Sequence, residues 1–159
     1  MAKKEEKTNA MRLLEQKGAQ YRAHHAEMKE ALSGVEMARL LGLPEERVFK
    51  TLVTVGRSKA HYVFVIPVAA SLHLKKAAAA VGEKSVEMIP QKELLPLTGY
   101  VHGGCSPLGM KKPFPTVIDR SAENYEEIIF SAGRIGYQVE LSPAELRKAL
   151  DFQLADLTE

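Results

Sequence analysis

The chain has 159 residues, of which 45% are apolar and 26% charged, and its formal net charge is +2. These values are typical of one globular domain with an ordinary core. One cysteine permits no internal disulfide, and no apolar stretch reaches the roughly 20 residues that a membrane span needs. Residues 1–7 are charged and have no apolar core behind them, unlike a signal peptide. We therefore expect a flexible arm at 1–7, a single domain at 8–159, no membrane segment and a cytoplasmic location.

The first elements predicted are two helices with a short strand between them. Thr8 can cap a helix that runs to Lys17, with Gly18 as the stop. Gln20–His25 is typical of a short strand. Ser33-Gly34-Val35-Glu36 fits a capping box, and apolar residues follow at helical spacing until Gly42.

The middle of the chain predicts a hairpin and a helix. Val48–Val55 and His61–Val68 are apolar, β-branched runs separated by Gly56–Ala60, a pattern typical of two antiparallel strands. An alanine-rich helix is expected to open at Ser71–Lys76 and to end before Gly82.

The second half predicts short strands at Glu87–Ile89, Thr116–Asp119, Ile128–Ser131 and Gly136–Leu141. A helical turn is expected at 91–95, and a last helix begins at Ser142-Pro143, which combines a capping residue with proline at the first helical position. Asp119 is expected to cap the turn after its strand. Mixed short strands and helices indicate the α+β class.

Lys50 interrupts the apolar run of the first hairpin strand. In a strand, Lys50 shares one face with Val48 and Leu52. The lysine therefore either lies at a sheet edge with its ammonium in solvent, or points into a cavity. In a cavity its charge could anchor a substrate or stabilise negative charge developing on an ester. From the residues alone, the edge lysine is the simpler interpretation.

Tyr100–Gly109 holds three glycines, a proline, a serine and the single cysteine within ten residues. Closely spaced glycines let backbone N–H groups face inward and hold an anionic oxygen. The candidate donors are the amides near Gly103, Gly104 and Ser106. A tight turn that only glycine tolerates explains the same pattern.

Cys105 lies beside Ser106 and three residues after His102, which raises the alternative of a cysteine hydrolase. A catalytic thiol needs a base at hydrogen-bond distance, and side chains three apart in a tight loop need not face each other. We therefore expect no catalytic thiol. The histidines show no ligand spacing, so neither a metal nor a cofactor is expected.

Three blocks of the chain together resemble one family. The blocks are Val48–Val53, Gly103–Gly109 and Ser131-Ala132-Gly133-Arg134. They resemble the signature blocks of the YbaK/EbsC family, freestanding relatives of the editing domain inserted in bacterial prolyl-tRNA synthetases. The similarity runs from about Thr8 to Leu150, in the family's order. It implies a compact, mostly antiparallel, barrel-like sheet flanked by helices.

The resemblance also implies a set of site residues. Because Lys50 matches the family's key lysine, it favours the cavity over the edge. Tyr21 matches an aromatic residue near the family's pocket and could stack on a terminal adenine, although a half-buried core tyrosine explains it as well. The implied catalytic residue is Lys50, and the implied substrate-binding residues are Tyr21, Gly103, Gly104, Cys105, Ser106, Ser131 and Gly133.

The function implied by the resemblance is trans-editing of mischarged Cys-tRNA(Pro). A pocket for proline cannot strongly reject cysteine on shape, so a second site must clear the wrong ester. In the implied chemistry the substrate's thiol attacks its own ester, and the enzyme supplies position and electrostatics. Two alternatives stay open: a deacylase for Ala or Ser on tRNA(Pro), and a non-catalytic module that binds the tRNA 3′ end.

The charge balance bears on the partners. A net charge of +2 does not predict an extended basic face of the kind that grips nucleic acid alone. We therefore expect contact with the charged 3′ end of tRNA, and a shared role in tRNA recognition for prolyl-tRNA synthetase.

Overall fold

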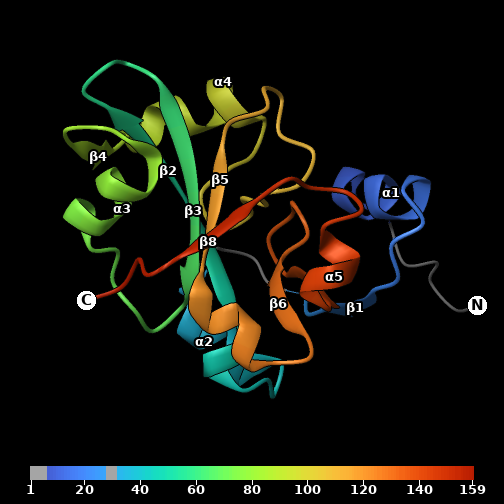
Figure 1. Cartoon of the computed structure of the whole chain (residues 1–159). Coiled ribbons are helices and arrows are strands. Elements are labelled where there is room, and N and C mark those ends of the chain that lie inside the picture. The colour runs from blue at the N-terminus through green and yellow to red at the C-terminus, as the bar shows by residue number, and fades with distance from the viewer. Residues whose placement is uncertain (1–6, 28–31) are drawn as a thin grey trace, which may run out of the picture.

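The computed structural model describes residues 7–27 and 32–159, and within these ranges helices flank two β-sheets (Figure 1). Most of the predicted arm, residues 1–6, lies outside the described residues. The helices are α1 (Asn9–Gln16), α2 (Gly34–Leu40), α3 (Leu74–Val81), α4 (Leu94–Thr98) and α5 (Pro143–Leu146), with short 3₁₀ helices η1 (Glu45–Arg47), η2 (Gln91–Glu93) and η3 (Arg120–Asn124). The strands are β1 (Arg22–His25), β2 (Phe49–Gly56), β3 (His61–Pro67), β4 (Val86–Met88), β5 (Thr116–Asp119), β6 (Ile128–Ser131), β7 (Tyr137–Leu141) and β8 (Gln153–Ala155).

The predicted helix caps form. The hydroxyls of Thr8, Ser33 and Ser142 each accept a backbone N–H in the first turn of α1, α2 and α5, and Ser33 takes part in a full capping box. The third helix begins later than expected, because His73 and not Ser71 caps it: the His73 Nδ1 accepts the amide of Lys76 at 3.3 Å. Asp119 caps η3 as predicted and also accepts the amide of Leu157 at 2.9 Å.

Within the described residues, the first sheet has the strand order β1-β7-β6 and the second β4-β2-β3-β5-β8. Neighbouring strands are antiparallel except for the parallel pairs β3–β5 and β5–β8. Val48, just before β2, forms a parallel bridge with Ile129 of β6, so β2 links the two sheets. This arrangement confirms the predicted α+β class with a mostly antiparallel, barrel-like sheet.

The two faces of the β2–β3 hairpin enter different cores. Val53 and Val63 pack in the main core with α1, whereas Phe64 and Ile66 pack in a second core with Ala77 of α3. Figure 1 shows α3 on the side of the sheet opposite to α1. Because strand residues alternate between faces, neighbours on β2 point to opposite sides.

The start of α2 lies close to the end of β3. A Cβ on Gly34 would overlap the side chain of Val68, so glycine is required for this approach. The contact places the first turn of α2 beside the first residues of β2.

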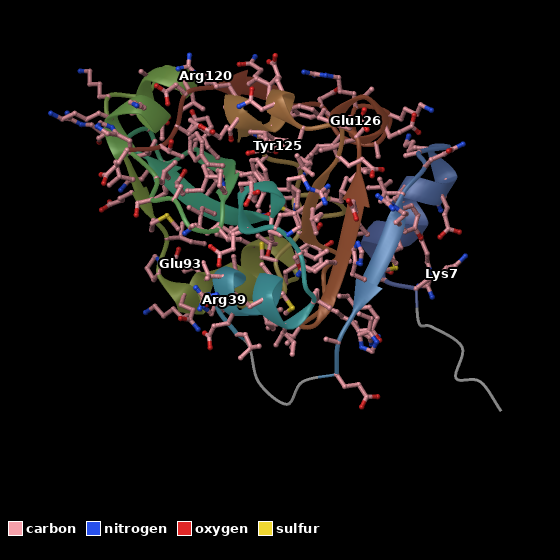
Figure 2. The ribbon with its side chains drawn as sticks, turned by 90° about the horizontal axis from the view of Figure 1, so that it is seen from below. Lys7, Arg39, Glu93, Arg120, Tyr125 and Glu126 are labelled. Carbon is pink, nitrogen blue, oxygen red and sulfur yellow. The ribbon has the colours of Figure 1, made fainter. Side chains whose placement is uncertain are left out.

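Charged side chains of both signs are spread around the molecule. In the view of Figure 2, the basic residues Lys7, Arg39 and Arg120 lie apart, with Glu93 and Glu126 between them along the outline. In the described ranges, no helix is long and apolar enough to cross a membrane.

Candidate active site

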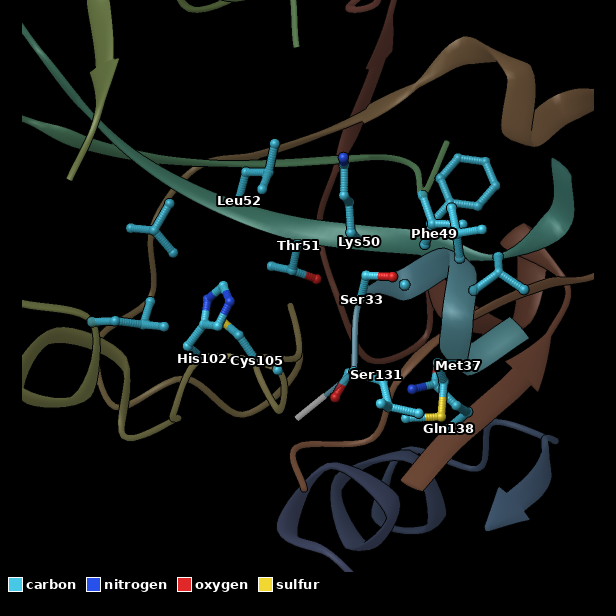
Figure 3. Close-up of a pocket in the computed structure, with 18 of the residues that line it drawn as sticks. Ser33, Met37, Phe49, Lys50, Thr51, Leu52, His102, Cys105, Ser131 and Gln138 are labelled. Atoms are coloured by element: carbon cyan, nitrogen blue, oxygen red, sulfur yellow. The ribbon is translucent and has the colours of Figure 1, made fainter. Parts of the chain in front are cut away.

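A cavity of about 520 Å³ lies along one edge of β2 (Figure 3). Its wall brings together the start of β2, the first turn of α2, the segment after β4, the glycine loop, the end of β6 and the start of β7. The lining residues are Leu32, Ser33, Gly34, Val35, Met37, Val48, Phe49, Lys50, Thr51, Leu52, Val53, Val68, Met88, Ile89, Gln91, Leu94, His102, Gly103, Cys105, Ser131 and Gln138.

The cavity exists because this edge of β2 is only partly paired. One edge of β2 pairs with β3 along the whole of residues 49–55. The other edge pairs with β4 from Thr54 onward and is bridged to β6 at Val48. Between these points no strand among the described residues pairs with it. The gap opens the strand edge to the cavity, so residues from both faces of β2 line it.

Lys50 lies in this gap. Its side chain is half-buried, and its ammonium has no ion pair or hydrogen bond among the described residues. Burial lowers the pKa of its ammonium below the ordinary value of 10.5. The residue therefore brings an uncompensated positive charge to the cavity wall.

The two polar residues of the gap point to different sides. Lys50 pairs with Ile66 and so belongs to the α3 face, whereas Thr51 pairs with Val65 of the main core. In Figure 3 the Lys50 ammonium extends to one side of β2, and Thr51 lies on the other, where His102 and Cys105 are drawn. The Thr51 hydroxyl is buried and has no hydrogen-bond partner in the described structure.

One glycine of the glycine loop lines the cavity, and it does so with its backbone. Gly103 lines the cavity with a φ of 86°, a conformation that favours glycine. Gly104 does not line it, and its N–H donates to the Val101 carbonyl at 3.0 Å, so this expected donor is taken up by the turn. Ser106 is fully buried, and its hydroxyl accepts the amide of Leu108 at 3.2 Å.

Tyr100 supports this loop from inside. Its hydroxyl donates to the Leu108 carbonyl, and burial, with a further contribution from Cys105, raises its pKa to about 12. Gly133 has a φ of 95°, and a Cβ there would lie 2.8 Å from the Tyr100 ring. Gly133 therefore makes room for Tyr100 and does not itself line the cavity.

The cysteine is unsuited to be a nucleophile. Cys105 lines the cavity together with His102, but it is only 9% exposed. Burial raises the pKa of its thiol to about 12, and a hydrogen bond with Thr98 offsets this only in part. Because the thiolate is the reactive form, a thiol with this pKa is inert near neutral pH. Among the described residues, no group of three or more His, Cys, Asp or Glu is arranged to hold a metal ion.

Ser131 lies in the cavity wall opposite Gln138 of β7, and its contact with a substrate stays a prediction. Tyr21 lies elsewhere. Its hydroxyl donates to Glu15 at 2.7 Å, and its ring borders a smaller hollow of about 80 Å³ beside His25 and Tyr137, whose rings stack 4.1 Å apart. Its contact with an adenine stays a prediction.

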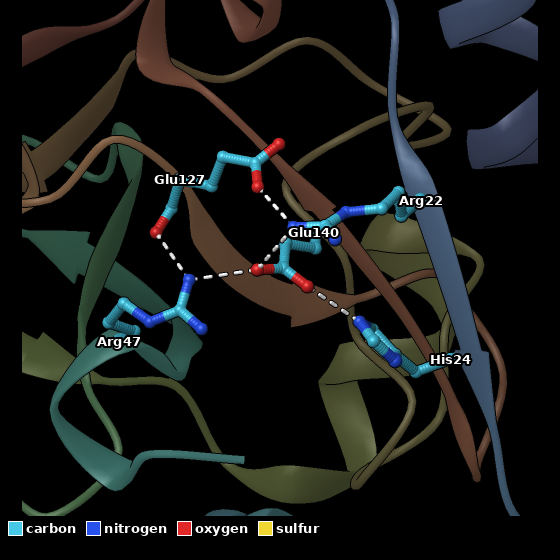
Figure 4. Close-up of polar contacts among 5 residues, drawn as sticks. All are labelled: Arg22, His24, Arg47, Glu127 and Glu140. Carbon is cyan, nitrogen blue, oxygen red and sulfur yellow. Dashed lines mark hydrogen bonds and ion pairs between the residues drawn. The ribbon is translucent and has the colours of Figure 1, made fainter.

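A buried carboxylate on β7 binds side chains from β1 and η1 (Figure 4). Glu140 of β7 is 3% exposed and bonds to His24 of β1 at 2.7 Å and to Arg47 of η1 at 2.8 Å, with Arg22 at 3.2 Å. Burial alone would raise the pKa of Glu140, but the bonds from His24 and Arg47 and the charge of Arg22 bring it, on balance, below its ordinary value. Because Arg47 precedes β2, this cluster fixes the first sheet against the strand that carries Lys50.

Sequence reasoning missed several residues of this wall, among them Ser33, Thr51 and Gln138. Thr51 had a usable signal, because it is the polar neighbour of Lys50 in a mostly apolar strand. Gln138 also had one, since the strands predicted at 128–131 and 136–141 could pair and bring it opposite Ser131. Ser33 had been assigned only its capping role.

Comparison with known proteins identifies the family of the chain. Residues 28–149 match the family of aminoacyl-tRNA editing domains. The chain is 47% identical, over 99% of its length and 98% of the relative's, to a protein of Enterococcus faecalis provisionally named Cys-tRNA(Pro)/Cys-tRNA(Cys) deacylase EbsC. It is 25% identical over 65% of its length to 18% of a proline–tRNA ligase of Burkholderia orbicola.

The fold has a matching solved structure. A crystal structure of a protein assigned provisionally as a trans-editing enzyme for prolyl-tRNA synthetase aligns with a TM-score of 0.81 at 27% identity, over 96% of this chain and 98% of that one. Sequence and fold thus lead to the same conclusion: the chain belongs to the aminoacyl-tRNA editing domains, and among them to the YbaK/EbsC family.

Proposed function

We propose that this protein is a trans-editing deacylase that removes cysteine from Cys-tRNA(Pro). The observation that carries the proposal is the composition of the cavity. Its wall holds an unpaired ammonium, Lys50, and a loop amide, Gly103, while its single thiol is buried and protonated. Such a site can position and polarise an ester but supplies no nucleophile of its own.

The nucleophile is then the cysteine of the substrate. Its sulfur forms a bond to the ester carbonyl carbon, the bond from that carbon to the ribose oxygen breaks, and the thiol proton ends on the ribose oxygen. The products are tRNA with a free terminal hydroxyl and a four-membered thiolactone, which water opens to cysteine. Positioning of this kind supplies much of the rate when the reacting groups belong to one molecule.

The proposed roles follow the positions of the residues. Lys50 anchors the substrate or offsets the negative charge that develops during attack. The Gly103 amide and Ser131 contact the ester or the terminal ribose, with Cys105 as a neutral part of the wall. Gly104, Ser106 and Gly133 act through the shape of the loop, which follows from their buried contacts.

The partners are the charged 3′ end of tRNA and prolyl-tRNA synthetase, and the place of action is the cytosol. The Enterococcus relative is named for both Cys-tRNA(Pro) and Cys-tRNA(Cys), which fits a site that reads the amino acid more than the tRNA body. A shared role for the synthetase would supply the missing tRNA selectivity.

The test is a panel of Cys-, Ser- and Ala-tRNA(Pro), with and without prolyl-tRNA synthetase. We expect Cys-tRNA(Pro) to be cleared much faster than the serine ester, because a thiol is the better internal nucleophile near neutral pH. Trapping should recover thiolactone before free cysteine accumulates. Equal rates on all three esters would indicate a generic deacylase that uses water, and binding without turnover would indicate a non-catalytic module.

A further inference from the structure

The open edge of β2 offers a second kind of recognition besides the charge of Lys50. Three residues with a hydroxyl, Ser33, Thr51 and Ser131, stand in the described lining of the cavity. Ser33 accepts the amide of Glu36 at 3.1 Å, and Ser131 accepts the amide of Gly133 at 3.2 Å. Thr51 alone of these has a buried oxygen without any partner. Buried polar groups are nearly always hydrogen-bonded, so this hydroxyl is expected to bond to a water molecule or to a ligand.

The backbone of Thr51 faces the same gap. The Val53 carbonyl accepts the Ile89 amide at 3.3 Å, on the β4 side of the strand. Backbone groups of alternate residues on a strand point to the same edge, so the N–H and C=O of Thr51 also point to that side. There they meet no strand, because pairing with β4 begins at Thr54. The edge thus provides a hydroxyl, an amide and a carbonyl at one residue.

The charges of the cavity restrict what this edge can hold. The titratable side chains that line it are Lys50 on β2 and His102 and Cys105 on the glycine loop, and no carboxylate lines it among the described residues. An aminoacyl ester carries an α-amine that is partly protonated near neutral pH, since an α-amino group has a pKa of about 7.7–8.0. An ammonium in this cavity would meet no carboxylate among the described residues, and the one charged lysine of the described wall carries a charge of the same sign.

We propose that the site takes its substrate with the α-amine uncharged and holds that amine at Thr51 on the open edge of β2. A neutral amine donates to the Thr51 carbonyl and accepts the proton of the Thr51 hydroxyl, whereas an ammonium can only donate to these two oxygens and would bring a charge that no carboxylate of the described wall offsets. The inference rests on the proposed function, because it concerns the aminoacyl group of the same substrate. It makes Thr51 a residue that contacts the substrate, and it attributes rejection of the charged amine to a described cavity wall that carries the Lys50 ammonium and no carboxylate.

The experiment uses binding of inert ligands, so that the ionisation of a substrate thiol does not enter. One ligand is 3′-deoxy-3′-(2-aminobutyrylamino)adenosine, in which an amide replaces the ester and an ethyl group replaces the thiol side chain. The second is its butyryl counterpart, which lacks the amine and reports titration of the protein alone. The affinity of the amine ligand should rise about 40-fold from pH 6 to pH 8, as its uncharged fraction does for a pKa near 7.8. The butyryl ligand should change little.

Two variants separate contact from structure. Thr51→Val keeps the shape and removes the hydroxyl, so it should weaken the amine ligand about five- to tenfold at pH 8 and leave the butyryl ligand unchanged. Thr54→Val is the matched control, because Thr54 does not line the cavity and its hydroxyl donates to the Tyr62 carbonyl at 3.1 Å. It should leave both affinities unchanged.

Tighter binding of the amine ligand at pH 6 than at pH 8 would overturn the inference, as would an affinity that does not depend on pH. Equal losses for both ligands in Thr51→Val would overturn the contact with the hydroxyl. Those results leave the proposed function standing, because they concern only the state of the amine. Failure of both ligands to bind at any pH would count against the proposed function as well.

Discussion

Replacing Lys50 by methionine tests the centre of the site with little structural disturbance. Lys50 has no partner among the described residues, so the change leaves no carboxylate or carbonyl unpaired. Loss of one contact that stabilises charge in a transition state costs roughly 10²–10³ in rate, or about 2.7–4 kcal/mol. We expect deacylation of Cys-tRNA(Pro) to fall by that factor in a single-turnover assay. Lys75→Met, an exposed change on α3, is the control and should keep the wild-type rate.

The same variant has an expected signature in stability. Burial holds the pKa of folded Lys50 below its ordinary value of 10.5, so the folded protein binds this proton less tightly than the unfolded chain does. The charged lysine therefore lowers stability at neutral pH, and this cost disappears as the pH rises through the folded pKa toward 10.5. Lys50→Met should be at least as stable as the wild type at pH 7, with the advantage shrinking in alkali. A folded variant with a near-normal rate would refute the assignment of Lys50 to the site.

Three further changes probe the surroundings of the site. Cys105→Ala should keep most of the deacylation rate, and a trapped acyl group on Cys105 of the wild type would contradict this. Gly133→Ala should lower the free energy of unfolding by about 1–3 kcal/mol, because it meets the Tyr100 ring at positive φ; an unchanged denaturation midpoint would speak against that packing. Glu140→Gln should lower the free energy of unfolding by about 1.5–3 kcal/mol at pH 7. Because the folded pKa of Glu140 is lowered, that difference should shrink as the pH falls below 4.5, as acid titration of unfolding would measure.

The parts of the fold that local chemistry decides could be predicted from the sequence. A cap needs only a hydroxyl and an amide three residues later, and this is why Thr8, Ser33 and Ser142 act as predicted. The start of α3 was missed because His73 can accept the same bond, which the preference for serine at caps conceals. Strand β8 has three residues and joins the sheet through a parallel pair with β5, so no local period marks it.

The candidate site, too, could be predicted only where local sequence determines it. The sequence left Lys50 either at a sheet edge or in a cavity. In the structure it is at both, because the cavity opens on the unpaired edge of β2. That gap depends on where β4 begins to pair and on the bridge from Val48 to Ile129, which are contacts between distant parts of the chain. The glycine pattern predicted a loop at the site. It could not show that the Gly104 N–H donates to the Val101 carbonyl.

A site without its own nucleophile has a consequence for correctly charged tRNA. Proline carries no thiol, so Pro-tRNA(Pro) that enters the cavity of such an enzyme has nothing to attack its ester and leaves intact. Discrimination against proline then lies in reactivity, and the cavity need not exclude a side chain of similar size. Cys-tRNA(Cys) gains no such protection, because its ester carries the same thiol. With a net charge of +2 and charges of both signs around its outline, the chain has little of its own with which to tell one tRNA body from another. The proposed partnership with prolyl-tRNA synthetase would supply the selection of tRNA(Pro), and addition of that synthetase should then protect Cys-tRNA(Cys) relative to Cys-tRNA(Pro) in a mixture of the two.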